Sequence, residues 1–207
     1  MDSIAYPIGN SLYLNITNRC SNHCSFCIRY KSKLFNQKHP LWLEHEPSTE
    51  EVIAAIGDPS KYDEIVFCGY GEPLIRLDVV KEVAKRLHSQ LPTPSSKLKL
   101  RVNTNGQANL FWGKNILPEL KGLIDKIVIS LDAQNAEVYQ SICRSDYGEK
   151  AYPAVTEFIK EAKKYIPQVE ASVVELPEVD IEACRKIAAE LGVVFRVRPY
   201  YEEEYKK

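Results

Sequence analysis

Short runs rich in β-branched and aromatic residues alternate along this chain with segments of helical periodicity. Six such runs cover residues 11–17, 64–69, 97–106, 126–133, 169–176 and 193–198. Between them, apolar residues recur with a period near 3.6, as from Val79 to Leu87 and from Val155 to Ala162. Strands that alternate with helices pair in parallel through right-handed crossovers. The pattern predicts an α/β fold, built either as a doubly wound sheet or as an incomplete barrel.

Local signals mark the ends of several helices. Ser48 and Glu51 have the spacing of a capping box ahead of an apolar run. Asp180 is placed to cap the last long helix, and Gly192 to end it. A turn is expected over residues 91–96, between a helix and a strand. Neither an internal repeat nor a linker interrupts the pattern, so residues 1–207 are expected to form one domain.

The composition fits a folded chain and argues against two kinds of partner. Of 207 residues, 44% are hydrophobic and 27% are charged, which is enough to bury a continuous core. A net charge of −1 argues against a protein that binds nucleic acid or membrane through bulk charge. The start of the chain lacks a basic segment followed by an apolar run, and no stretch reaches membrane-spanning length. We therefore expect a cytoplasmic protein with no membrane partner.

The connection from the first expected strand to the second is unusually long and carries three clustered cysteines. It runs from Asn18 to Asp63, and Cys20, Cys24 and Cys27 stand near its start. Connections of this length are usually functional. Six cysteines are too few for a secreted disulfide scaffold of this length, and clustered cysteines in a reducing compartment more often bind metal. The three cysteines follow a strand's carboxyl end, where α/β proteins place their active sites.

Two kinds of metal site fit three thiolates at this spacing. A structural zinc site takes four ligands, and His23 and His39 are the candidates for the fourth. An iron–sulfur cube has four irons, so three cysteines leave one iron open for another ligand. The thiols alone do not choose between these two sites.

Further motifs follow the next three expected strands. The spacing CxxxCxxC, with Phe26 before the last cysteine, is joined by "FCGYGEP" at 67–73, "VNTNG" at 102–106 and "SLD" at 130–132. In kind and in order, these motifs resemble those of the radical S-adenosylmethionine (SAM) enzymes. More narrowly, "FCGYGEP", "RVNTNG" and "LGVVFRVRPY" resemble the small radical SAM proteins linked to TatD-type nucleases.

The resemblance implies a fold, two cofactors and a reaction. Members fold as a partial (β/α)6 barrel of the TIM type. Cys20, Cys24 and Cys27 would hold a [4Fe–4S] cluster, whose fourth iron is chelated by the amino and carboxylate groups of SAM. An external electron donor of the flavodoxin or ferredoxin type would reduce the cluster, which cleaves SAM to methionine and a 5′-deoxyadenosyl radical. That radical would abstract a hydrogen atom from a substrate that the sequence does not identify.

The resemblance also assigns residues to SAM. Gly69 and Gly71 would let the backbone approach SAM closely, and Glu72 would accept hydrogen bonds from its ammonium group. The other residues of this cofactor-binding set are Phe26, Asn103, Thr104, Ser130 and Asp132, with Arg198 at the methionine carboxylate. Simpler interpretations remain for four positions: Ser130 and Asp132 as helix caps, and Asn105 and Gly106 as a turn that ends a strand.

The remaining cysteines have no neighbour at ligand spacing. They are Cys68, Cys143 and Cys184. Cys184 lies on the apolar stripe of its helix, and we expect all three to pack as small buried thiols. Cys68 ends a strand beside the glycine turn, so a thiol that faces the site is the alternative there. The sequence therefore predicts one cluster only.

A basic stretch with interleaved aromatic residues follows the clustered cysteines. Residues 28–42 contain Arg29, Lys31, Lys33 and Lys38 but no acid, together with Tyr30, Phe35 and Trp42. Charge plus stacking would suit an anionic, nucleotide-like substrate, and a solvated loop is the alternative. Two other functions stay open at this point: a zinc-stabilised nucleic-acid-binding module, and a simple iron–sulfur electron carrier.

Overall fold

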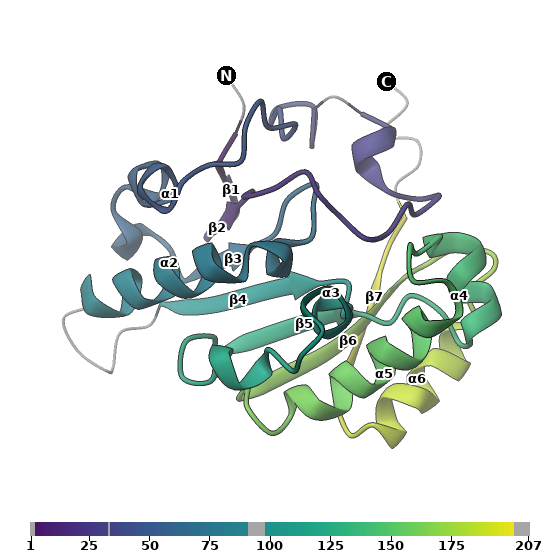
Figure 1. The fold of residues 1–207 in the computed structure, drawn as a ribbon. Helices are drawn as coiled ribbons and strands as arrows, with labels where there is room; N and C mark the ends of the chain where they lie inside the picture. The colour runs from purple at the N-terminus through teal and green to yellow at the C-terminus, as the bar shows by residue number, and fades with distance from the viewer. Residues whose placement is uncertain (1–2, 33, 91–97, 201–207) are drawn as a thin grey trace.

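One mostly parallel sheet organises the chain. The computed structural model describes residues 3–32, 34–90 and 98–200, so Lys33 and the turn expected over 91–96 lie outside the described residues. Within them the sheet has seven strands in the order β1-β2-β3-β4-β5-β6-β7 (Figure 1). The strands are β1 (Ala5–Ile8), β2 (Ser11–Leu14), β3 (Glu64–Phe67), β4 (Lys99–Thr104), β5 (Lys126–Ser130), β6 (Gln168–Val174) and β7 (Val194–Arg198). All six expected strands are confirmed, as β2 to β7.

The sequence missed the first strand. β1 pairs with β2 in an antiparallel hairpin through a turn at Gly9 and Asn10, where Gly9 has φ +56°. Glycine adopts such a φ without the clash that a Cβ would cause. β1 is only four residues long and contains Pro7, which suits an edge strand but weakens its sequence pattern.

Helices connect the parallel strands. They are α1 (Thr49–Ile56), α2 (Leu77–Gln90), α3 (Ala108–Trp112), α4 (Ala136–Cys143), α5 (Ala151–Ala162) and α6 (Ile181–Glu190), with 3-10 turns at Ile28–Tyr30 (η1), Pro59–Lys61 (η2), Pro73–Arg76 (η3), Leu117–Leu120 (η4) and Gly148–Lys150 (η5). The capping box is confirmed, since the side chain of Ser48 and that of Glu51 each bond to the other's backbone N–H. Asp180 caps α6 as expected, and Gly192 follows its end with φ +67°.

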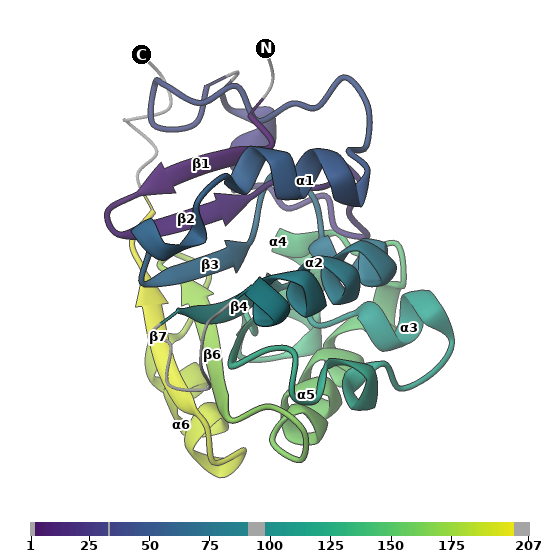
Figure 2. The same ribbon diagram turned by 90° about the vertical axis from the view of Figure 1, so that its left-hand side faces the viewer.

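The helices cover one face of the sheet, which distinguishes the two architectures left open by the sequence. A doubly wound sheet carries helices on both faces. Here the buried residues of the six described helices join a single core with the same face of the strands. Figure 2, turned by 90°, shows α1, α2, α3 and α5 on the same side of the strands. The arrangement is that of a partial barrel, with a helical outer layer and a concave inner face.

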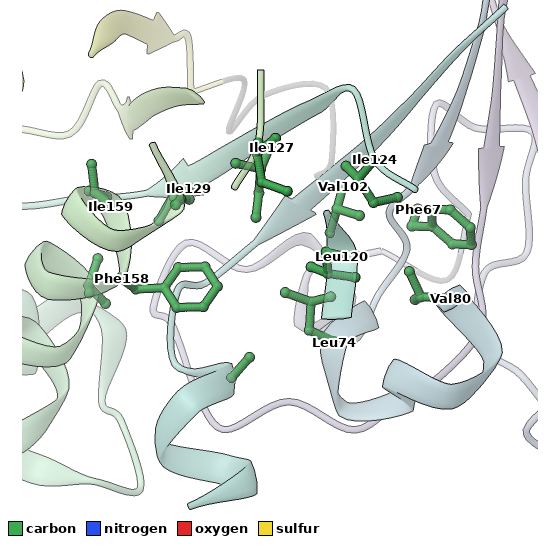
Figure 3. Close-up of a cluster of buried hydrophobic side chains, with 14 of the residues drawn as sticks. Phe67, Leu74, Val80, Val102, Leu120, Ile124, Ile127, Ile129, Phe158 and Ile159 are labelled. Carbon is green, nitrogen blue, oxygen red and sulfur yellow. The ribbon is translucent and has the colours of Figure 1, made fainter. Parts of the chain in front are cut away.

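The outer face of the sheet is apolar because alternate strand residues point toward the helices. Figure 3 shows Phe67, Val102, Ile127 and Ile129 from the strands lying against Leu74, Val80, Leu120, Phe158 and Ile159. Burying one such side chain is worth about 1.5–3 kcal/mol relative to leaving it exposed. This face therefore supplies most of the stabilisation and fixes the positions of the strand ends.

The inner face carries charges and polar groups instead. Toward the start of the strands, Arg101 lies 2.9 Å from Glu64 and Lys126 lies 2.7 Å from Glu170. A buried charge needs such a partner to offset its lost hydration. Because β2 to β7 are parallel, their carboxyl ends meet at the opposite edge, which is where an α/β barrel places its site.

No helix in the described ranges is long and apolar enough to cross a membrane.

Candidate functional site

The cysteine-bearing loop crosses the carboxyl edge of the sheet. It leaves β2, passes the end of α4 and continues into η1, and Figure 1 shows it running above the strand ends toward α4. Cys20, Cys24 and Cys27 are all free and partly exposed. Burial, followed by the charge of Glu72, raises the pKa of the Cys20 thiol to about 12. A metal that binds this sulfur must therefore displace its proton.

The three thiols fit a cluster better than a single ion. Among the described residues, no three Cys, His, Asp or Glu side chains are close enough together to hold one metal ion. A zinc ion needs its ligands to converge on one centre. A [4Fe–4S] cube takes each thiolate at a different iron, so its three sulfurs do not need to converge on one centre. The donor set, three free thiols on one loop, fits the cluster in number and in chemistry.

The two histidines proposed as zinc ligands are engaged elsewhere. The ring of His23 lies 3.2 Å from the hydroxyl of Tyr30 and 3.1 Å from the carboxylate of Asp146. The ring of His39 packs 5.4 Å from that of Tyr6. Neither histidine therefore adds a ligand to the cysteines in this structure.

A buried polar network holds the cysteine loop on the barrel. Its members are Ser21, Asn22, Asn105, Gln107, Tyr139 and Ser145. Gln107 stands at the centre: its amide oxygen accepts from the hydroxyls of Ser21 and Ser145, both at 2.9 Å. Its amide nitrogen donates to Asn22 and to Tyr139, both at 2.8 Å. This network was not predicted from the sequence, where its signal is the run of polar residues that follows β4.

Two of the other cysteines pack as predicted. Cys143 and Cys184 are fully buried in the main core. Cys143 also adjoins the loop, because its carbonyl accepts from the N–H of His23 at 2.9 Å. A hydrogen bond with Cys24 and burial both raise the pKa of the Cys143 thiol. Sequence spacing gave no sign of the contact between Cys24 and Cys143, which are 119 positions apart.

Cys68 lies at the inner face rather than in the core, and it is only half-buried. Its side chain points the same way as Asn103, on the neighbouring strand. Burial raises the pKa of the Cys68 thiol, and a hydrogen bond with Asn103 opposes the shift. A thiol that faces the site therefore describes Cys68 better than the expected buried core thiol.

Glu72 joins the turns that follow β3 and β4. Its side chain is buried, and one carboxylate oxygen accepts from the N–H of Leu74 at 3.0 Å and from the hydroxyl of Thr104 at 2.8 Å. The other oxygen accepts from the N–H of Asn105 at 2.6 Å. Burial raises the pKa of Glu72 and these three hydrogen bonds lower it. The net pKa is about 7, above the usual value of 4.5. In this structure the carboxylate is occupied by the protein's own donors.

Gly69 and Gly71 sit where no side chain fits. A Cβ on Gly71 would lie 2.3 Å from the carbonyl oxygen of Thr17 and 2.5 Å from that of Arg19. A Cβ on Gly69 would lie 2.0 Å from the side-chain oxygen of Asn15. The glycines therefore let this turn pack against the start of the cysteine loop. Tyr70, inserted between them, is buried and donates to the carbonyl of Ser32 at 2.9 Å.

Asp132 and Arg198 form an ion pair at the ends of β5 and β7. One guanidinium nitrogen lies 2.9 Å from Asp132 and 3.2 Å from the hydroxyl of Ser130. Burial raises the pKa of Asp132, and the Arg198 charge opposes that shift. The interpretation of Asp132 as a helix cap is wrong, because Asn135 caps α4 through its side chain. Asp132 instead turns the chain out of β5 with φ +53°.

Three buried polar atoms at this edge have no partner within the part of the chain that the structure describes. They are Asn103 Oδ1, Ser172 Oγ and Arg198 Nε. Their strands are β4, β6 and β7, and Ser172 pairs in register with Ser130 on β5. An unpaired buried polar group costs about 1–3 kcal/mol, so such groups are usually matched by a ligand or water. The inner edge therefore fits a polar cofactor such as SAM.

The SAM-binding set predicted from the sequence is gathered at one edge but not in one contact network. Thr104 bonds to Glu72, and Ser130 and Asp132 bond to Arg198. Phe26 is half-buried and packs against the main core. Ser172 was missed, because nothing in its strand distinguishes it from an ordinary inward-facing serine.

The basic stretch after the cysteines separates into different roles. Arg29 donates to the carbonyls of Asn18 and Asn22 at 3.1 and 3.0 Å, so it braces the loop. Lys31 and Lys38 are exposed, and Lys33 lies outside the described residues.

A groove of about 480 Å³ adjoins Cys20. Its lining includes Arg19, Arg29, Tyr30, Trp42, Phe111 and Tyr147.

Comparison with known proteins agrees with this geometry. Residues 14–191 match the family model described as the radical SAM superfamily. A protein of Thermococcus kodakarensis named "Probable GTP 3′,8-cyclase" is 29% identical over 168 residues, which are 81% of this chain and 48% of that protein. The dual-specificity RNA methyltransferase RlmN of Bdellovibrio bacteriovorus is 24% identical over 69% of this chain and 34% of its own length. The chain thus spans about half or less of these relatives.

Solved structures share the fold. HydG, a maturase of the [FeFe]-hydrogenase, aligns over 92% of this chain and 42% of its own with a TM-score of 0.62 and 18% identity. A radical SAM methyltransferase from Sphaerobacter thermophilus aligns over 94% of this chain and 68% of its own with a TM-score of 0.55 and 15% identity. Radical SAM enzymes use a [4Fe–4S] cluster and SAM and need a reductant. With the family model matching most of its length, this chain belongs to the radical SAM superfamily.

Proposed function

We propose that Cys20, Cys24 and Cys27 hold the [4Fe–4S] cluster and that SAM binds its open iron from the inner edge of the sheet. The observation that carries this proposal is that three free thiols meet, at one edge of a parallel barrel, three polar atoms that have no partner among the described residues. Bound there, the cluster and SAM would supply radical chemistry that removes a hydrogen atom from the substrate. The protein's own residues bind, orient and exclude water.

The residues around SAM have separate tasks in this proposal. Asn103, Ser172 and Arg198 use their free polar atoms on the ribose and methionine parts. Glu72 accepts from the ammonium group if one of its present donors yields. Arg198 serves the methionine carboxylate through the nitrogen that Asp132 leaves free. Gly69 and Gly71 keep the turn close enough to the loop for these groups to reach the cluster.

For the substrate we propose an anionic, nucleotide-like molecule. The groove beside Cys20 combines Arg19 and Arg29 with one acid, Asp146, and with exposed aromatic rings, since Tyr30 is 56% and Trp42 57% exposed. Aromatic rings with nearby cations suit stacked bases and phosphates. Three curated relatives named as probable GTP 3′,8-cyclases act, by name, on a nucleotide. The near-neutral net charge favours a small anion over a long polyanion.

Other expectations from the sequence remain proposals. These are the narrower kinship with TatD-linked radical SAM proteins, an electron donor of the flavodoxin or ferredoxin type, a single core domain over residues 1–207, and a cytoplasmic location. The zinc-stabilised module is disfavoured by the positions of His23 and His39. A simple electron carrier would hold the cluster without cleaving SAM.

The test is a cleavage assay on anaerobically reconstituted protein. Iron, sulfide and zinc are determined first, and 5′-deoxyadenosine is then followed by mass spectrometry after addition of SAM and dithionite. We expect iron and sulfide in equal amounts and steady formation of 5′-deoxyadenosine. A cluster that cleaves no SAM would support the electron carrier, and bound zinc in place of iron would support the structural module.

A further inference from the structure

We infer that Asn105 donates an N–H···S hydrogen bond to the Cys20 sulfur and thereby raises the reduction potential of the cluster. This inference rests on the proposed function, because it concerns the cluster that Cys20 would hold. The side-chain nitrogen of Asn105 lies 3.7 Å from the Cys20 sulfur, within reach of a hydrogen bond to sulfur. Asn105 is only 9% exposed, so little water competes for this contact.

The orientation of the Asn105 amide is fixed by its neighbours. Its side-chain oxygen accepts from the backbone N–H of Gln107 at 2.9 Å, which only an oxygen can do. The nitrogen must therefore face Ser21 and Cys20. Ser21 agrees with this assignment, because its hydroxyl donates to Gln107 at 2.9 Å and so accepts from Asn105 at 3.0 Å. A flipped amide would place two donors against each other at Gln107 and two acceptors against each other at Cys20.

The backbone of Asn105 is held as firmly as its side chain. Its N–H donates to Glu72 at 2.6 Å, which ties the turn after β4 to the turn after β3. Hydrogen bonds thus connect Glu72 to Asn105, and Asn105 to Cys20 on the cysteine loop. The backbone N–H of Asn22 supplies a second donor to the same sulfur at 3.4 Å.

The direction of the effect follows from charge. Reducing the cluster adds one electron, and part of that negative charge appears on the ligating sulfurs. A donor hydrogen that points at such a sulfur stabilises the reduced state more than the oxidised state. In a site with little water the effect is larger than in solution. Removing the donor is therefore expected to shift the potential to more negative values and to make reduction harder.

Asn105 drew no functional interpretation from the sequence. Its position in "VNTNG" is equally typical of a turn that ends a strand, and it does form one. The structure adds the direction of the side chain, which a turn alone does not require. Asn105 is a positioning residue, because it acts on the cluster through the Cys20 sulfur.

The experiment is a redox titration of the reconstituted cluster followed by electron paramagnetic resonance. The variants are Asn105→Asp, which keeps the acceptor for Gln107 but removes the donor and adds a charge, and Asn105→Ser, whose shorter uncharged side chain withdraws the donor from the sulfur. Asn109→Asp is the matched control, because it adds the same charge four residues along, where the side chain also accepts a backbone N–H at 2.9 Å. Iron content is measured for each protein.

We expect the midpoint potential to fall in the order wild type, Asn105→Ser, Asn105→Asp, with Asn109→Asp close to wild type. Equal potentials in loaded wild type and Asn105→Ser would overturn the inference while leaving the proposed function intact. A shift in Asn109→Asp as large as that in Asn105→Asp would also overturn it, because general charge would then explain both. A wild-type protein that holds no cluster would refute the proposed function and the inference with it.

Discussion

Substituting Gly71 with alanine is expected to disrupt the start of the cysteine loop through steric contact alone. Gly71 is not among the residues with positive φ, so the alanine backbone itself is unstrained. Its Cβ would lie 2.3 and 2.5 Å from two carbonyl oxygens, whereas ordinary contact begins at 3.4 Å. Both neighbours are backbone atoms, which cannot rotate away, so the loop must move by about 1 Å.

The size of the effect follows from two contributions. Overpacking of this kind costs about 1–3 kcal/mol. The same movement disturbs the hydrogen bond from the Glu72 N–H to the Arg19 carbonyl, 2.8 Å long, whose loss adds about 1 kcal/mol. We therefore expect Gly71→Ala to lower the free energy of unfolding by about 3 kcal/mol and to reduce cluster loading.

The assay is urea unfolding of the cluster-free proteins, with iron content measured after reconstitution. Gly122→Ala is the control. Gly122 has φ +74°, and a Cβ added there would meet nothing within 4 Å. Alanine there therefore costs only about 1–2 kcal/mol of backbone strain. If Gly71→Ala unfolds within about 0.5 kcal/mol of wild type, or loses less stability than the control, the packing argument is wrong.

Three further predictions concern the site. Alanine at Cys20, Cys24 or Cys27 should abolish iron binding, whereas Cys184→Ala, in the core, should keep it; equal losses would refute the single-cluster assignment. Because the pKa of Glu72 is raised from 4.5 to about 7 in the folded state, its contribution to stability is full below pH 4.5 and is lost as the pH rises through 7. Unfolding experiments should show wild type losing about 3 kcal/mol more than Glu72→Gln between pH 4.5 and 8, and parallel curves would contradict this. Neutralising Lys31, Lys33 and Lys38 together should lower substrate turnover and its salt sensitivity, and unchanged turnover would leave them as solvated residues.

Much of the fold was predictable because strand and helix patterns depend on local sequence. The stripe of Val155, Phe158, Ile159 and Ala162 is buried as its spacing indicates. β1 escaped prediction because its pairing depends on a neighbour and its four residues carry little pattern of their own. Helix coverage of one face could not be predicted from periodicity, since crossovers to either face give the same alternation.

The site was predictable in its location but not in its contacts. Motifs at strand ends placed Cys20, Glu72 and Asn103 at one edge, since parallel strands share that edge. The partners of these residues depend on tertiary packing between distant segments. Gln107 at the centre of the buried network and Cys143 beside Cys24 are examples, because no spacing rule links residues on different elements.

The central claim is that three cysteines leave one iron open and that SAM occupies it. The most direct measurement is electron–nuclear double resonance on the reduced cluster with SAM labelled by ¹⁵N at its amino group. This account predicts a hyperfine coupling between the cluster and the labelled nitrogen in the wild-type protein. A fully loaded cluster that shows no such coupling, and whose spectrum is unchanged by SAM, would contradict it.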